Sequence, residues 1–337
     1  MTSRERINNT IDRKPVDRVP YSFDLTGIVA DGLRNHYRLA PDVNLHAHIG
    51  DDLLYVGSSL FDAAGDNPLL QTDEFGTLWD RSGMNRQIGD WGTILSHPLK
   101  EASLQGYAFP DGANPARFAG FDVGAFRAQG RFVILGVIGL FDIGWQLRGF
   151  EDFMMDMAGD ETFAEELLDK ALEFNLKLLS CAPDGIDGVR FGEDWGLQKG
   201  MIMGAQLWRK YLKPRLRIMY EAARKKGLRV FIHTCGDIAE IFPDLIEIGV
   251  EAVNPVQPEA MDIAFLRREY GRDITMYGGL GSQSTLVYGS PADVVAEAKS
   301  RLALFDNGGY IIGPAGAIPT DAPLENVIAL VDFLRGL

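Results

Sequence analysis

The sequence predicts an α/β protein built as a (β/α)8 TIM barrel. Short apolar runs alternate with helical patterns along most of the 337 residues, and this alternation is typical of a parallel sheet covered by helices. Eight of the runs have the length and composition of strands, which is the number that closes such a barrel. In chain order they are Val19–Phe23, Leu53–Val56, Arg131–Val137, Gly188–Phe191, Arg229–His233, Ala252–Pro255, Ile274–Tyr277 and Tyr310–Gly313.

Helical patterns separate these strands. Several end at a glycine, the residue that most often follows a helix, and others begin with a proline, which is favoured in the first turn. The expected helices are Ser3–Asn9 with Ser3 as its cap, Asp160–Cys181, Ala205–Lys226, Ile238–Ile248, Met261–Tyr270, Pro291–Leu304 and Pro323–Leu334.

Residues 60–130 do not follow the alternation. We interpret them as an inserted segment, with a hairpin and loops that lie over the barrel mouth. No repeat, low-complexity tract or linker divides the chain, and residues 1–337 are therefore predicted to form a single barrel domain.

Composition and charge exclude some classes of partner and indicate a location. The net charge of −14 argues against nucleic acid and against an anionic membrane as partners, because both repel an acidic surface. No signal-peptide pattern and no membrane-length apolar stretch is visible. The two cysteines, Cys181 and Cys235, are expected to be reduced thiols. These observations predict a cytoplasmic protein.

The stretch Phe231–Gly236 carries the clearest chemical signal. His233 and Cys235 come at the end of an apolar strand and precede a glycine. An imidazole nitrogen and a thiolate sulfur are the usual zinc donors, although a catalytic zinc needs at least three protein ligands. The alternative is a histidine held by a backbone hydrogen bond beside a small apolar cysteine.

Catalytic groups of a barrel come from the carboxyl ends of its strands. Glu193 and Asp194 follow the fourth strand, and as neighbours on extended backbone they face opposite directions. One is expected to point into the barrel mouth and the other to cap the following helix. Either could be the third metal ligand, Glu193 included, or a general acid or base. The alternative is a carboxylate pair satisfied by backbone amides.

Other polar and aromatic residues at the strand ends are candidates for substrate binding. They are Tyr21, Trp195, Asn254, Gln257 and Gln283. Asn254 and Gln257 carry amides that can hydrogen-bond a polar ligand, and Gln283 follows a glycine-rich turn. Trp195 could equally pack between loops.

Several segments together resemble the uroporphyrinogen decarboxylase superfamily. They are Gly188–Gly196, Phe231–Gly236, Asp244–Gly249, Asn254–Glu259, Gly309–Asn326, Ser3–Arg6 with Asp17–Pro20, and Asp73–Gly76 with His97–Leu99. The resemblance covers nearly the whole chain and implies a (β/α)8 barrel. Decarboxylases of this superfamily carry an Arg-Gln-Ala-Gly-Arg motif that grips the substrate carboxylates. The matching region here, Tyr21–Ile28, lacks those arginines, so that activity is not favoured.

The other branch of the superfamily holds zinc methyltransferases that act with a corrinoid protein. Their signature is His-x-Cys followed by a distant Cys. His233 and Cys235 match its first part, but Gly316 stands where the distant Cys is expected. The resemblance therefore implies a methyltransferase-like enzyme, with zinc on His233, Cys235 and a carboxylate.

That enzyme would move a methyl group between a small methylated compound, or a corrinoid carried by a partner protein, and an acceptor. The resemblance also implies a homodimer. Two alternatives stay open, which are a metal-free decarboxylase of the uroporphyrinogen type and a non-catalytic barrel that binds a small ligand.

Overall fold

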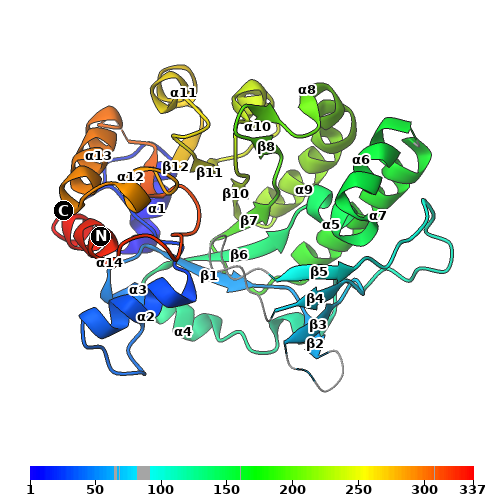
Figure 1. The fold of residues 1–337 in the computed structure, drawn as a ribbon, viewed down its shortest axis with the longest axis horizontal. Coiled ribbons are helices and arrows are strands. Elements are labelled where there is room, and N and C mark those ends of the chain that lie inside the picture. Colours follow the sequence, from blue (N-terminus) through cyan, green and yellow to red (C-terminus); the bar gives the residue numbers. More distant parts are fainter. Residues whose placement is uncertain (64–66, 68, 82–91, 160, 307) are drawn as a thin grey trace.

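The computed structural model describes residues 1–63, 67, 69–81, 92–159, 161–306 and 308–337. Its centre is a curved sheet of seven parallel strands, and helices cover its outer face (Figure 1). In spatial order the strands are β1 (Leu53–Gly57), β6 (Phe132–Ile138), β7 (Gly188–Gly192), β10 (Arg229–His233), β11 (Ala252–Val256), β12 (Thr275–Leu280) and β13 (Tyr310–Pro314). The predicted α/β barrel class is confirmed.

The first predicted strand, Val19–Phe23, is present only as an isolated bridge. Tyr21 pairs with Ile312 of β13, and the Tyr21 carbonyl accepts a hydrogen bond from the Asp52 amide at 3.0 Å. This short extended segment therefore lies between β13 and the start of β1. It occupies the eighth position of the barrel. Its contacts with the neighbouring strands are these few hydrogen bonds, whereas a full strand would form a continuous ladder of hydrogen bonds on each side.

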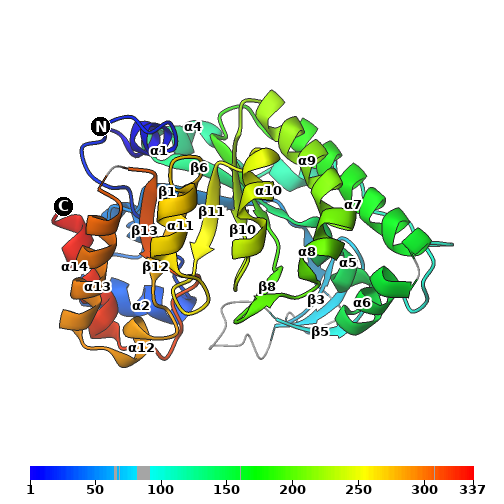
Figure 2. The ribbon, with the colours of Figure 1, turned by 90° about the horizontal axis from the view of Figure 1, so that it is seen from above.

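The helices agree with the sequence pattern best in the second half of the chain, where strands and helices alternate most regularly (Figure 2). Their bounds are α1 Ser3–Ile11, α2 Gly27–His36, α3 Leu45–His48, α4 Val123–Ala128, α5 Leu140–Arg148, α6 Phe150–Gly159, α7 Glu161–Cys181, α8 Gly204–Leu207, α9 Lys213–Lys225, α10 Phe242–Glu247, α11 Ile263–Tyr270, α12 Thr285–Tyr288, α13 Pro291–Leu304 and α14 Leu324–Arg335. None of the described helices is long and apolar enough to cross a membrane.

Two helix predictions need correction. Thr2, not Ser3, caps α1, because its hydroxyl accepts from the Glu5 amide while the Glu5 carboxylate accepts from the Thr2 amide. The helix expected over Ala205–Lys226 is interrupted by a π-helical turn at Trp208–Leu212. Asp160, the expected start of the helix before β7, lies outside the described residues.

Residues on the two faces of the sheet belong to separate apolar clusters. The inner cluster lines the interior of the barrel, which we call the lumen. It contains Leu53, Phe132, Ile134, Phe231, Ala252, Tyr277 and Ile311, with Ile7 of α1 buried among them. The α1 helix therefore closes the bottom of the barrel. Alternation along each strand then places residues two positions farther along, such as His233 on β10 and Asn254 on β11, toward the lumen near the mouth.

The inserted segment forms a second, antiparallel sheet. Its strands are β2 (Phe61–Ala63), β3 (Leu70–Asp73), β4 (Leu78–Asp80) and β5 (Thr93–Ser96). It follows the carboxyl end of β1 and lies at one end of the barrel sheet (Figure 1). The sequence predicted a hairpin in this segment, but the structure has a sheet of four paired strands. The single-domain organisation of residues 1–337 stays a prediction.

A buried ion-pair network fixes the N-terminal segment to the bottom of the barrel. The Asp52 carboxylate has no exposed surface and contacts Arg6 Nη1 at 2.5 Å and Arg18 Nη1 at 2.7 Å. It also accepts the Tyr21 amide at 2.9 Å. Asp17 accepts a further hydrogen bond from Arg6. The N-terminal motif that resembles the family therefore has a structural role here.

We predict that Asp52→Ala lowers the free energy of unfolding by about 3–5 kcal/mol, because Arg18 loses its carboxylate partner and buried Arg6 keeps only the partly exposed Asp17. Urea unfolding followed by circular dichroism measures this change. Arg268→Ala is the matched control, since its ion pair with Glu269 is exposed and should contribute less than about 1 kcal/mol. Equal effects of the two substitutions would contradict the assignment.

Candidate metal centre at the strand ends

The loop after β10 has a conformation that brings Cys235 back over the barrel mouth. Gly236 adopts a φ of 79°, and a Cβ at this position would lie 2.3 Å from the carbonyl carbon of Gly196. Only glycine fits this turn. Gln257 supports it from the next strand, because its side-chain oxygen accepts the Gly236 amide at 3.1 Å. Gln257 thus positions the cysteine loop.

Three side chains from two strand ends converge at this point. The donor atoms of Asp194, His233 and Cys235 lie within 4.8 Å of one another, and His233 Nε2 lies 3.8 Å from Cys235 Sγ. Zinc–sulfur and zinc–nitrogen bonds of normal length at a tetrahedral angle separate the two donors by about 3.6 Å. The group therefore fits a zinc ion, with a fourth position left for a ligand.

Asn254 determines which nitrogen of His233 faces this group. Its side-chain oxygen lies 2.7 Å from His233 Nδ1 and also accepts a weaker hydrogen bond from Arg190 Nη1 at 3.4 Å. An oxygen acceptor requires the proton on Nδ1 and leaves the lone pair on Nε2, the atom that faces Cys235. Burial, with a further contribution from the Arg190 charge, lowers the pKa of His233, so the ring is a neutral donor.

Cys235 is a protonated thiol in the absence of a metal. Burial raises the pKa of Cys235 to about 12, and the Asp194 carboxylate, which accepts the Cys235 amide at 2.9 Å, acts in the same direction. A cation bound between these two groups would reverse this effect, because it stabilises the thiolate.

Glu193 and Asp194 face opposite directions, as the alternation predicts. Glu193 is buried, and its carboxylate accepts the amides of Leu140 at 2.6 Å and Phe141 at 2.9 Å. It therefore caps the N-terminus of α5, which follows the neighbouring strand β6, and not the helix after its own strand. Asp194 alone of the pair joins His233 and Cys235, so Asp194 and not Glu193 is placed to offer a carboxylate donor.

Sequence reasoning missed Asp142, which lies on α5 beside this group. Burial and the neighbouring Asp194 carboxylate raise the pKa of Asp142, and Trp145 Nε1 donates a hydrogen bond to it at 2.9 Å. Burial and the Asp142 charge likewise raise the pKa of Glu193 to about 8. The signal was available, since Asp142 follows the third predicted strand at the same edge of the sheet.

Two residues proposed for substrate binding lie elsewhere. Trp195 is fully buried, donates to Glu193 and packs edge-to-face on Trp208, so we assign it to the core. Tyr21 belongs to the cluster outside the sheet, and its hydroxyl donates to the Ile49 carbonyl. Neither side chain faces the barrel mouth.

Gln283 and Gly316 complete the predicted set. Gln283 is exposed and accepts a hydrogen bond from Gln198 of the β8–β9 hairpin (β8 Gly196–Leu197, β9 Gly200–Met201), so it lies on the surface of the mouth. Gly316 has a φ of 100° and an added Cβ would meet nothing within 4 Å. A cysteine at this positive φ would be strained. Among the described residues, only Asp194 offers a third donor beside His233 and Cys235.

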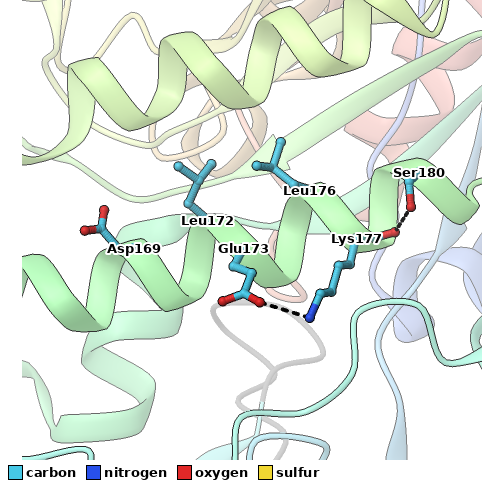
Figure 3. Close-up of a pocket in the computed structure, with 6 residues that line it drawn as sticks. All are labelled: Asp169, Leu172, Glu173, Leu176, Lys177 and Ser180. Carbon is cyan, nitrogen blue, oxygen red and sulfur yellow. Dashed lines mark hydrogen bonds and ion pairs between the residues drawn. The ribbon is translucent and has the colours of Figure 1, made fainter.

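The outer surface of α7 carries an unrelated hollow. It is lined by Leu172, Leu176 and the Glu173–Lys177 ion pair (Figure 3). In Figure 3 the two leucines point to one side of α7 and the ion pair to the other, and none of these residues belongs to the metal-binding group.

Comparison with known proteins supports the assignment of the family. Residues 133–337, more than half of the chain, match the family described as Uroporphyrinogen decarboxylase (URO-D). Methylcobamide:CoM methyltransferase MtbA of Methanosarcina acetivorans is 20% identical over 99% of this chain and 98% of its own length. The same enzyme of Methanosarcina mazei is also 20% identical over 99% of the chain.

A solved structure has the same fold. A methyltransferase from Methanosarcina mazei superposes with a TM-score of 0.70 at 17% sequence identity and covers 100% of this chain and 99% of its own. The barrel architecture and the family match agree, and this chain belongs to the uroporphyrinogen decarboxylase family.

Proposed function

We propose that the protein is a zinc-dependent methyltransferase that moves a methyl group between a corrinoid carried by a partner protein, or a small methylated compound, and an acceptor thiol. The observation that carries this proposal is the convergence of His233 Nε2, Cys235 Sγ and the Asp194 carboxylate, with Asn254 orienting the imidazole. The curated relatives, named methylcobamide:CoM methyltransferases, support it.

His233, Cys235 and Asp194 would hold the metal. A zinc ion bound there would lower the pKa of a coordinated thiol and keep it as a thiolate, the form that accepts a methyl group. Asn254 keeps Nε2 directed at the donors, and Gln257 keeps the cysteine loop closed over the mouth. Outer partners of this kind fix ligand orientation in metal sites.

Asp142 has a separate role in this proposal. Its raised pKa allows it to take up a proton near neutral pH, and it lies beside Asp194. We assign it the transfer to solvent of the proton that the acceptor thiol releases on binding, since a bound cation favours the ionised form of Asp142 and it does not keep that proton.

The surrounding charge also favours a cation. Burial raises the pKa values of Asp142 and Glu193, with a further contribution from the Asp194 charge on Asp142 and from the Asp142 charge on Glu193. Burial with the Asp194 charge likewise raises the pKa of Cys235. A divalent ion would lower each of these raised pKa values, since opposite charge favours the ionised form.

The cytoplasmic location and the homodimer stay predictions. Both Cys181 and Cys235 are free thiols.

We predict about one zinc per chain in protein purified without chelator. Cys235→Ala and Asp194→Asn should lose most of this zinc, together with methyl transfer from methylcobalamin to a thiol. Elemental analysis measures the first property and the absorbance change of the corrinoid the second. Cys181→Ala, which removes an exposed cysteine at the end of α7, is the control and should keep both. Wild-type protein without zinc, and unable to take it up, would overturn the proposal.

Zinc affinity should rise at least tenfold per pH unit between about pH 7 and pH 9, because the buried Cys235 thiol, whose pKa is about 12, must release one proton on binding. Asp142 and Glu193, whose pKa values are raised, steepen the slope at the lower end of this range. His233 adds no proton in this range, since its pKa is lowered from the ordinary value. Competition with a chelator at several pH values gives the slope. An affinity that is independent of pH would show that Cys235 is not a ligand.

Asn254→Ala should weaken zinc binding by about 10- to 100-fold, because the imidazole loses the acceptor that fixes its orientation. Asn254→Asp keeps an oxygen acceptor and should retain most of the affinity. The same chelator competition measures both variants. Unchanged binding in Asn254→Ala would remove Asn254 from the site.

A further inference from the structure

Three neighbouring strands carry glycines on their lumen side near the mouth. They are Gly57 on β1, Gly136 on β6 and Gly192 on β7. Gly57 lies four positions after Leu53 and Gly136 two positions after Ile134, both of which face the lumen. Gly192 lies two positions after Arg190, which pairs with Gly136. A Cβ added to Gly57 would meet nothing within 4 Å, and at Gly136 and Gly192 the nearest atoms are backbone oxygens at 3.7 and 3.9 Å. The lumen is therefore open over these three strands.

Arg190 of β7 borders this open space. It pairs in register with Gly136, which pairs in turn with Gly57. The outward neighbours of Arg190, Val189 and Phe191, belong to the outer core, so alternation directs Arg190 into the lumen. Its side chain is only partly covered.

The Arg190 guanidinium has no carboxylate within ion-pair distance among the described residues. It lies over the Tyr55 ring at 4.4 Å and donates to Asn254 Oδ1 at 3.4 Å, while Asp24 acts on it only at longer range. Two buried arginines of this chain do have a carboxylate partner, Arg6 with Asp52 and Arg117 with Glu74. A guanidinium inside a protein without a counter-ion is costly unless a ligand supplies one.

Two phenols beside Arg190 form a hydrogen-bonded pair. The Tyr55 hydroxyl donates to the Tyr277 hydroxyl at 3.3 Å, and the Tyr277 hydroxyl keeps its own proton as a donor. Burial raises the pKa of both phenols, so they keep their protons and cannot serve as the missing anion. Positive charge and hydroxyl donors together favour an oxyanion.

Asn254 connects this position to the metal-binding group. Its single side-chain oxygen accepts from Arg190 and from His233, so the guanidinium and the imidazole are held on either side of one atom. A small molecule with its anionic head at Arg190 therefore has its other end beside His233 and Cys235.

We propose that Arg190 determines substrate specificity by binding the oxyanion head group, a carboxylate or a sulfonate, of the small methyl donor or acceptor. This inference rests on the proposed function for the identity of the reacting end, which would be the thiol or methyl group placed at the donors. Recognition of the head group by Arg190 depends only on the lumen geometry.

The test compares matched ligands on the zinc-loaded protein by isothermal titration calorimetry. Mercaptopropionate and mercaptopropanesulfonate should bind about 10- to 100-fold more tightly than neutral mercaptopropanol, as expected for a charge-assisted hydrogen bond. The stronger of the two anions identifies the head group. Arg190→Gln should abolish the preference, and Arg190→Lys should keep part of it because the charge remains.

Arg209→Gln is the control, since Arg209 lies on the surface and pairs with Asp244. It should leave the preference unchanged, and zinc content should be normal in all three variants. Equal binding of anionic and neutral ligands by wild type, or a preference that survives Arg190→Gln, would overturn the proposal.

A second arm separates this inference from the metal. Propionate, propanesulfonate and propanol lack a thiol and are titrated into protein freed of zinc. If wild type holds no zinc but still prefers the anions through Arg190, the zinc proposal fails and this one stands. If zinc binds but the anions bind no more tightly than propanol, the zinc proposal stands and this one fails.

Discussion

The carboxyl ends of β7, β10 and β11 are held in register by backbone hydrogen bonds, and the candidate site depends on that register. The Glu193 amide donates to the His233 carbonyl and the Thr234 amide donates to the Asn254 carbonyl, each at 2.8 Å. These two bonds continue the parallel ladder past the regular strands. They fix the side of the sheet to which Asp194, His233 and Asn254 point.

Anchors behind the sheet keep this register from relaxing. Glu193 accepts the first amides of α5, and Trp195 donates to the same carboxylate while its own amide donates to Thr234 Oγ1. A buried hydrogen-bond network of this kind is rigid because each broken bond leaves an unsatisfied polar atom. Asp194, exposed between these two anchored residues, is held at the mouth without being buried itself.

Charge is arranged around the same few atoms. Asp142 and Asp194 place carboxyl groups at the mouth, whereas Arg190 places a cation deeper inside the lumen. Asn254 lies between them and accepts from both Arg190 and His233. The mouth therefore favours a metal cation and the deeper lumen favours an anion, which suits a small acid that meets a metal at its reacting end.

The sequence by itself determined the barrel and the position of its strongest motif. Apolar periodicity located all eight extended segments, and His233 and Cys235 were recognisable because strand, donor spacing and glycine are adjacent in the chain. Period-two alternation also predicted that Glu193 and Asp194 face opposite ways. Which of them faces the site was decided only by tertiary structure, because the amides that hold Glu193 belong to α5, about fifty residues earlier.

Tertiary contacts also decided the remaining residues. Asp142 and Arg190 join the site because β6, β7 and β10 are neighbours in the sheet. The position of Asp142 after a predicted strand was a signal, but nothing local to Arg190 indicates that it joins the site. Trp195 is in the core because Trp208 of the π-helical turn packs on it. Tyr21 faces outward because the pairing of its segment with Ile312 and Asp52 sets its parity. Local sequence fixes period and donor type, whereas the face and the neighbours of a side chain depend on strand pairing between distant segments.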